Sequence, residues 1–113
     1  MPAGSNAVRM AAIRYVNDAF PGFVECALVD VHGAVWTFIE KVPVVSLADL
    51  DARSTYPQPV TVACAVVATR RDPDGREVVT IDTSVPWGIA ASSGETRFEV
   101  GAEQLTASDE PTG

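Results

Sequence analysis

The sequence predicts a mainly β domain, a small antiparallel barrel or sandwich of about six strands built from consecutive hairpins. Three short turns, at residues 30–33, 72–75 and 93–94, interrupt runs that are rich in Val, Ile, Thr and aromatic residues. Residues of these types favour strands, and tight turns between them favour hairpins. With 113 residues, 47% of them hydrophobic, the chain is long enough for one folded domain and too short for two cores.

The first segment, residues 8–19, fits two secondary structures, and both stay open. Residues 9–16 read as a strand, and Pro21 with Gly22 ends the segment in either case. A meander needs only the short connection at residues 20–22, which slightly favours the strand. The helical alternative rests on a stripe formed by Val8, Ala11, Ala12, Tyr15, Val16 and Ala19.

The turn at residues 30–33 sets the register of one hairpin. Asp at its first position and Gly at its fourth are typical of a type I turn with a G1 bulge, which pairs Asp30 with Ala34. A two-residue turn would instead place Glu25 opposite Glu40, two like charges. The core face of this hairpin is then predicted to carry Val24, Cys26, Leu28, Trp36 and Phe38. The opposite face carries Glu25, Ala27, Val29, Val35, Thr37 and Ile39.

The turn at residues 72–75 sets the register of another hairpin. Pro73 fixes its φ at about −65°, which excludes a type I′ turn. The strand at residues 60–69 is apolar or neutral on both faces, so we expect it to be buried on both. Counting outward from the turn predicts the cross-strand pairs Arg71–Glu77, Thr69–Val79 and Val67–Ile81.

Three further local expectations complete the prediction. The turn at residues 93–94 predicts a hairpin in which Ile89 faces Phe98. Ser46, followed three residues later by Asp49, is typical of a capping box and predicts a short helical turn near residues 47–51. Residues 1–7 and 107–113 are expected to be disordered, which leaves a single β-rich domain at residues 8–106.

Composition excludes several classes of protein. The chain has 15 acidic and 8 basic residues, a formal net charge of −7, so it should repel nucleic-acid phosphates. It has no apolar run near the ~20 residues of a membrane span and no basic-then-apolar leader, so we expect a cytoplasmic protein that does not bind membranes. The preference for Arg over Lys, together with many Ala and Val, suggests a GC-rich bacterial genome.

The sequence offers no catalytic or metal-binding set. Cys26 and Cys64 lie in apolar runs without metal-ligand spacing, which predicts buried free thiols. His32, the one histidine, lies at a turn tip where no third group is expected to orient it, so we interpret it as a solvated turn residue. There is no Gly-rich phosphate loop and no close carboxylate pair. We therefore expect no cofactor and no metal, and a non-enzyme rather than an enzyme.

The segment Pro86, Trp87 and Gly88 is the one candidate binding site. A Trp beside Pro and Gly in a connection is a recurrent contact residue at protein interfaces. The structural alternative, that Trp87 closes the open end of a barrel, carries more weight at this stage.

Together these features favour a small acidic domain that acts by binding another protein. An acidic surface favours a basic partner, self-association is a second form of binding, and an immunity or antitoxin protein that blocks a basic toxin is one special case. The alternative is a small-ligand carrier or an enzyme with a pocket at the barrel mouth. The polar groups available to such a pocket are Tyr15, Tyr56, Asp82 and Cys64.

Trp36 tests the register of the first hairpin. Trp36→Ala is expected to lower the free energy of unfolding by about 3 to 5 kcal/mol, because it deletes a large aromatic side chain from the core face. Val35→Thr, on the opposite face, should cost much less. Denaturant midpoints measure both effects, and the reverse ranking would mean that the hairpin slips by one residue and its faces exchange.

Overall fold

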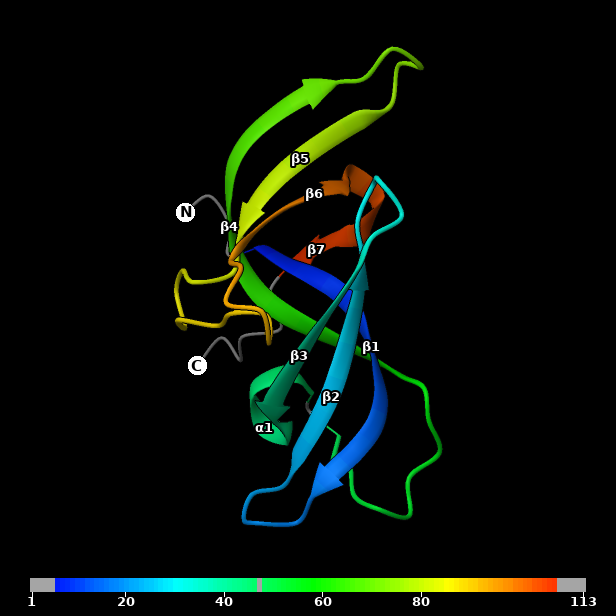
Figure 1. Ribbon diagram of the computed structural model, residues 1–113, viewed down its shortest axis with the longest axis vertical. Coiled ribbons are helices and arrows are strands. Elements are labelled where there is room, and N and C mark those ends of the chain that lie inside the picture. The colour runs from blue at the N-terminus through cyan, green and yellow to red at the C-terminus, as the bar shows by residue number, and fades with distance from the viewer. Residues whose placement is uncertain (1–5, 47, 108–113) are drawn as a thin grey trace.

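The computed structural model describes residues 6–46 and 48–107, which form one curled antiparallel sheet with the shape of a half-barrel (Figure 1). The predicted mainly β fold is thereby confirmed. Two short helical segments, α1 (Val42–Val45) and the 3-10 turn η1 (Ala102–Gln104), accompany the sheet. Its strands are β1 (Asn6–Asn17), β2 (Phe23–Val29), β3 (Val35–Lys41), β4 (Gln58–Arg71), β5 (Glu77–Asp82), β6 (Arg97–Gly101) and β7 (Leu105–Ala107).

Strand β1 links the parts of the sheet, whose order is β3-β2-β1-β4-β5-β6. Its first half pairs with β4, its second half pairs with β2, and its first three residues also pair with β7. Register shifts lie between Ala12 and Arg14 and between Tyr15 and Asn17. Such bulges bend a strand and increase its twist, which suits the curl of the sheet. The N-terminal segment is therefore a strand, the alternative that the sequence slightly favoured.

The predicted register of the β2–β3 hairpin is confirmed. Leu28 pairs with Trp36 and Cys26 pairs with Phe38, and the Asp30 N–H donates to the Ala34 carbonyl at 3.0 Å. The predicted core face is buried except at Trp36, which is half-buried at the edge of the core. Its indole Nε1 donates to Asp30 Oδ2 at 2.9 Å, so the turn also satisfies the polar atom of this ring.

The β4–β5 hairpin follows the predicted register only near its turn. Arg71–Glu77 and Thr69–Val79 pair as predicted, whereas Val66, and not Val67, lies opposite Ile81. The predicted Val67–Ile81 pair is wrong because a register shift lies between Val66 and Ala68, which turn-based counting does not reveal.

The prediction that residues 60–69 are buried on both faces is also wrong. Val60, Val62 and Cys64 are buried, but Val66 and Val67 are 41% and 44% exposed. The reason is topological, since among the described residues β1 pairs with β4 only as far as Cys64. Beyond that residue, β4 has only β5 beside it among the described strands.

The third predicted turn forms, but the ladder expected to follow it does not. The Ala91 N–H donates to the Glu95 carbonyl at 2.9 Å, which closes the turn. Phe98 pairs with Ile81 of β5 and not with Ile89, whose N–H donates to the Thr83 carbonyl. The predicted facing of Ile89 and Phe98 is thus wrong, because β6 pairs with β5 instead.

The short helix lies a few residues earlier than predicted. It is α1, with Pro43 in its first turn, a position where the missing N–H of proline costs nothing. Residues 48–51 are not helical, and Ser46 Oγ accepts a hydrogen bond from the Ala48 N–H in a local turn. None of the helices in the part of the chain that the structure describes has the length and apolar character to cross a membrane.

The expectation of disordered ends falls largely on residues 1–5 and 108–113, which lie outside the described residues. Asn6 and Ala7 belong to β1, and Ala107 ends β7. Residues 6, 7 and 107, which were assigned to the disordered ends, are thus part of strands.

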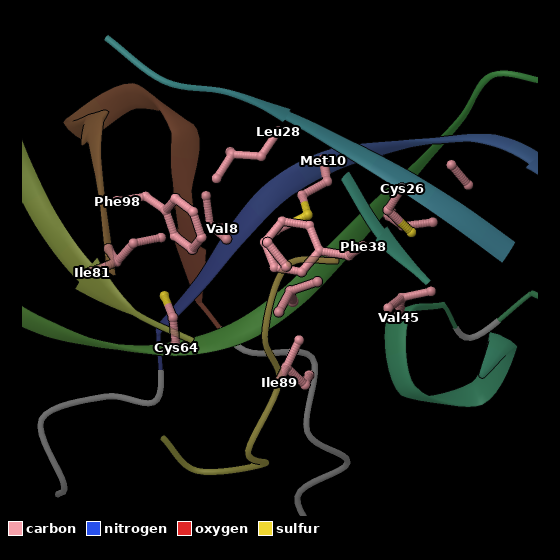
Figure 2. Packing of buried hydrophobic residues seen from close by; sticks show 14 of the residues in the cluster. Val8, Met10, Cys26, Leu28, Phe38, Val45, Cys64, Ile81, Ile89 and Phe98 are labelled. Atoms are coloured by element: carbon pink, nitrogen blue, oxygen red, sulfur yellow. The ribbon is translucent and has the colours of Figure 1, made fainter. Parts of the chain in front are cut away.

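The core fills the hollow of the curled sheet (Figure 2). Cys26 and Cys64 are 0% and 3% exposed and are free thiols, as predicted. Burial raises the pKa of Cys26 to about 12 and that of Cys64 to about 11, so neither forms a reactive thiolate near neutral pH. The largest fully buried side chains include Phe38, Leu28, Ile81, Val8, Val24 and Val62.

A polar network fastens the tip of the β2–β3 hairpin to β6. The Val31 N–H donates to the Glu99 carbonyl at 3.0 Å, and His32 Nε2 lies 2.8 Å from Glu99 Oε1. Arg70 of β4 adds two hydrogen bonds to the same carboxylate, both of 3.1 Å. His32 is thus an exposed turn residue whose ring is oriented by Glu99, so the prediction that no group orients it is wrong. This partner lies 67 residues further along the chain.

Glu99 makes the stability of this closure depend on pH. Hydrogen bonds from Arg70, and then from His32, lower the pKa of Glu99 from its usual 4.5 to about 2. A carboxyl whose pKa is lower in the folded state stabilises the fold at pH values above its unfolded-state pKa, here about 4.5. This contribution is lost as the pH falls through 4.5 toward 2. Glu99→Gln should therefore lower the free energy of unfolding at pH 7 by about 1 kcal/mol, the upper range for partly exposed ion pairs.

The measurement is urea unfolding of both proteins between pH 7 and pH 2, where their difference should shrink toward zero in acid. Glu77→Gln is the matched control, because Glu77 is exposed and makes no ion pair among the described residues. A Glu99→Gln difference that persists undiminished at pH 2 would contradict a role for the Glu99 charge.

Candidate functional site

The candidate site is the loop at residues 84–88, part of the connection from β5 to β6 that protrudes from the sheet (Figure 1). Trp87 is 62% exposed and Val85 is 51% exposed, and Pro86 between them is exposed as well. Trp87 therefore does not close an end of the barrel, the alternative that had carried more weight from the sequence. The three predicted site residues, Pro86, Trp87 and Gly88, lie together on this loop.

Thr83 ties the two sides of the loop together at its base. Its side chain is fully buried, and its hydroxyl donates to the Ile89 carbonyl at 2.7 Å. The backbone of Thr83 donates to the Thr96 carbonyl at 2.9 Å and accepts from the Ile89 N–H at 3.1 Å. A buried hydroxyl with its hydrogen bonds satisfied fixes local geometry, because breaking those bonds would leave polar groups unpaired.

Asp82 braces the start of the loop from the other side. Its Oδ1 atom accepts hydrogen bonds from the Ser84 N–H at 2.9 Å and from the Ser84 hydroxyl at 2.6 Å, and its Oδ2 atom accepts from Arg97 Nε at 3.2 Å. The bonds from Ser84 are the main reason that the pKa of Asp82 is lowered, and the Arg97 guanidinium lowers it further. Asp82 is therefore an ionised positioning residue for this loop.

The far end of the loop is held by a turn and by the core. The Gly88 N–H donates to the Ser84 carbonyl at 2.7 Å, and Gly88 has a φ of +70°, a conformation that side chains with a Cβ adopt at a cost. Ile89 follows at once and is 3% exposed, with its side chain among the core residues (Figure 2). The loop is thus held on both sides while its apolar residues face solvent.

The polar residues considered for a pocket do not converge. Cys64 lies opposite Asn6, and Asp82 lies opposite the neighbouring Ala65. Tyr15 is nine residues further along β1, about 30 Å along an extended strand, and Tyr56 lies near Tyr15. The Tyr56 hydroxyl donates to the Asp51 carbonyl at 2.8 Å. The four groups thus form two pairs at opposite ends of β1, an arrangement that does not supply one shared pocket.

No group of three or more His, Cys, Asp or Glu side chains that could hold a metal ion occurs among residues 6–46 and 48–107. Comparisons of the chain with protein-family models, with curated proteins and with solved structures find no match.

Phe20 is an exposed aromatic residue that the sequence did not single out as a candidate site. Its side chain is 97% exposed on the connection between β1 and β2. The signal in the sequence is the tripeptide Phe20, Pro21 and Gly22, whose Pro and Gly also mark the end of the first segment. Trp87 has the same pattern, an aromatic residue beside Pro and Gly in a connection between strands.

Thr83 provides a direct test of how firmly the loop is held. Thr83→Val preserves the shape of the side chain and removes the buried hydroxyl, so it should destabilise the protein by about 1 to 2 kcal/mol. It should also increase the fast motion of Trp87, measured by time-resolved fluorescence anisotropy in a Trp36→Phe background. Thr80→Val, at a half-buried position on β5, is the control. Unchanged anisotropy in the Thr83→Val protein would mean that this hydroxyl does not restrain the loop.

Proposed function

We propose that this chain is a protein-binding domain whose principal contact residue is Trp87. The observation that carries the proposal is a largely exposed tryptophan on a loop fixed at its base by Thr83 and Asp82. Tryptophan is enriched among residues that dominate binding energy. A contact residue on a preorganised loop also loses little conformational freedom on binding, so more of its burial contributes to affinity.

The charge of the chain supports a basic partner. A formal net charge of −7 attracts a positively charged protein over several ångströms and repels acidic proteins and nucleic acids. Binding should then weaken as salt is raised, because screening shortens the range of the attraction. An immunity or antitoxin protein that blocks a basic toxin is one form of this proposal, supported by the size and charge of the chain.

The test compares the wild-type chain with Trp87→Ala. Capture from native lysate at low and at moderate salt identifies a partner, and calorimetry with the purified partner measures affinity. Trp87→Ala should weaken binding by at least about 30-fold, the loss expected for a dominant contact residue of about 2 kcal/mol. The melting temperature should hardly change, since surface substitutions usually alter stability by less than about 0.5 kcal/mol.

Val35→Ala is the matched control, because Val35 is 61% exposed, nearly as exposed as Trp87, on the outer face of β3. An equal loss of affinity in both variants would indicate nonspecific hydrophobic binding. Failure to capture any partner at either salt concentration would count directly against the proposal.

A further inference from the structure

Phe20 is the most exposed of the large hydrophobic side chains in the described part of the chain, at 97%. It belongs to the β1–β2 connection, which lies at the end of the molecule opposite the tip of the β4–β5 hairpin (Figure 1). A single exposed apolar residue is common and needs no explanation by itself. What distinguishes Phe20 is the way its turn is held and the charges around it.

Contacts on three sides hold the turn in place. Asn17 Oδ1 accepts a hydrogen bond from the Ala19 N–H at 3.1 Å, and the Gly22 N–H donates to the Ala19 carbonyl at 2.6 Å. The Val42 N–H, at the start of α1, donates to the Gly22 carbonyl at 2.9 Å. The Phe20 ring is therefore displayed by an ordered turn, as Trp87 is displayed by its loop.

The phenol ring of Tyr15 supports the same turn from inside. Gly22 has a φ of +94°, and a Cβ atom placed on it would lie only 2.7 Å from the Tyr15 hydroxyl oxygen. Only glycine therefore fits at this position with the ring in place. The close approach couples the shape of the turn to β1.

The surroundings of the turn are acidic. The pKa of Tyr15 is raised, mainly by burial and further by the negative charges of Asp18 and Asp51. Both carboxylates therefore lie near the Tyr15 ring. Asp18 and Asp51 are exposed, and neither takes part in an ion pair among the described residues.

We propose that the turn carrying Phe20 is a second docking site, for a basic protein surface that receives the phenyl ring between apolar groups. Lysine or arginine side chains at the rim of that surface pair with Asp18 and Asp51, neither of which has a cationic partner among residues 6–46 and 48–107. The charge complementarity selects this occupant over a second copy, because two copies would bring like charges together. The same carboxylates oppose an anionic membrane surface.

The probe is a synthetic peptide of alternating leucine and lysine, which offers apolar groups flanked by positive charge. Its control is the matched peptide with glutamate in place of lysine. Titration of the full-length, ¹⁵N-labelled chain should shift the amide resonances of residues 17–20, Gly22 and Asp51 with the lysine peptide only. Phe20→Ala and Asp18→Asn should each weaken this binding by about tenfold, without unfolding the protein, because both side chains are exposed.

Val35→Ala should leave the peptide affinity unchanged, and so should Trp87→Ala, which separates this site from the proposed Trp87 contact. The proposal is overturned if the glutamate peptide binds equally, if the shifts map to the Trp87 loop, or if no binding occurs at millimolar peptide. It is equally overturned if Phe20 drives self-association, or binding to phosphatidylcholine vesicles, in place of peptide binding.

Discussion

The curl of the sheet depends on Phe98, where its two edge strands meet. The Phe98 ring of β6 packs edge-on against Trp36 and Phe38 of β3, with ring centroids 5.2 Å and 5.6 Å apart. β3 and β6 are the first and last strands in the strand order. Without this contact the sheet would stay open, and one of its apolar faces would be exposed to solvent. Two backbone hydrogen bonds, Val31 to Glu99 and Ser92 to Thr37, reinforce the closure.

The geometry of the Trp87 loop follows from the same closure. Ile89 and Ala91 are buried, and the next residue, Ser92, donates its N–H to the Thr37 carbonyl of β3. The chain therefore leaves β5, forms the exposed loop, and crosses to β3 before it returns as β6. Thr83 and Asp82 fix the first half of this path, whereas the core and the Ser92–Thr37 hydrogen bond fix the second. The exposed position of Trp87 therefore depends on contacts outside residues 84–88, both at the base of the loop and in the core.

The sequence predicted what is encoded locally and missed what is encoded by distant contacts. The register around Asp30 and Gly33 follows from the turn residues themselves, so its pairs and faces are confirmed. The bulge beside Val67 arises where β4 changes its neighbour from β1 to β5, and no turn residue reports that change. Likewise, Glu99 orients His32 across 67 residues of chain. The composition of residues 86–88 predicts a candidate contact site, but the exposure of Trp87 depends on the path of the chain between β5 and β6.

Two pairs of carboxylates among the described residues, Glu99 with Asp82 and Asp18 with Asp51, differ in their surroundings. Glu99 and Asp82 accept several hydrogen bonds, including one or more from an arginine, and their lowered pKa values show that the folded state favours their charge. These groups stabilise the closure and brace the loop. Asp18 and Asp51 lie near Tyr15, and no cationic side chain of the described residues pairs with them. Because a charge without a counterion in its own fold gains most from an external one, Asp18 and Asp51 are the carboxylates on which the proposed basic partner of the Phe20 turn would act.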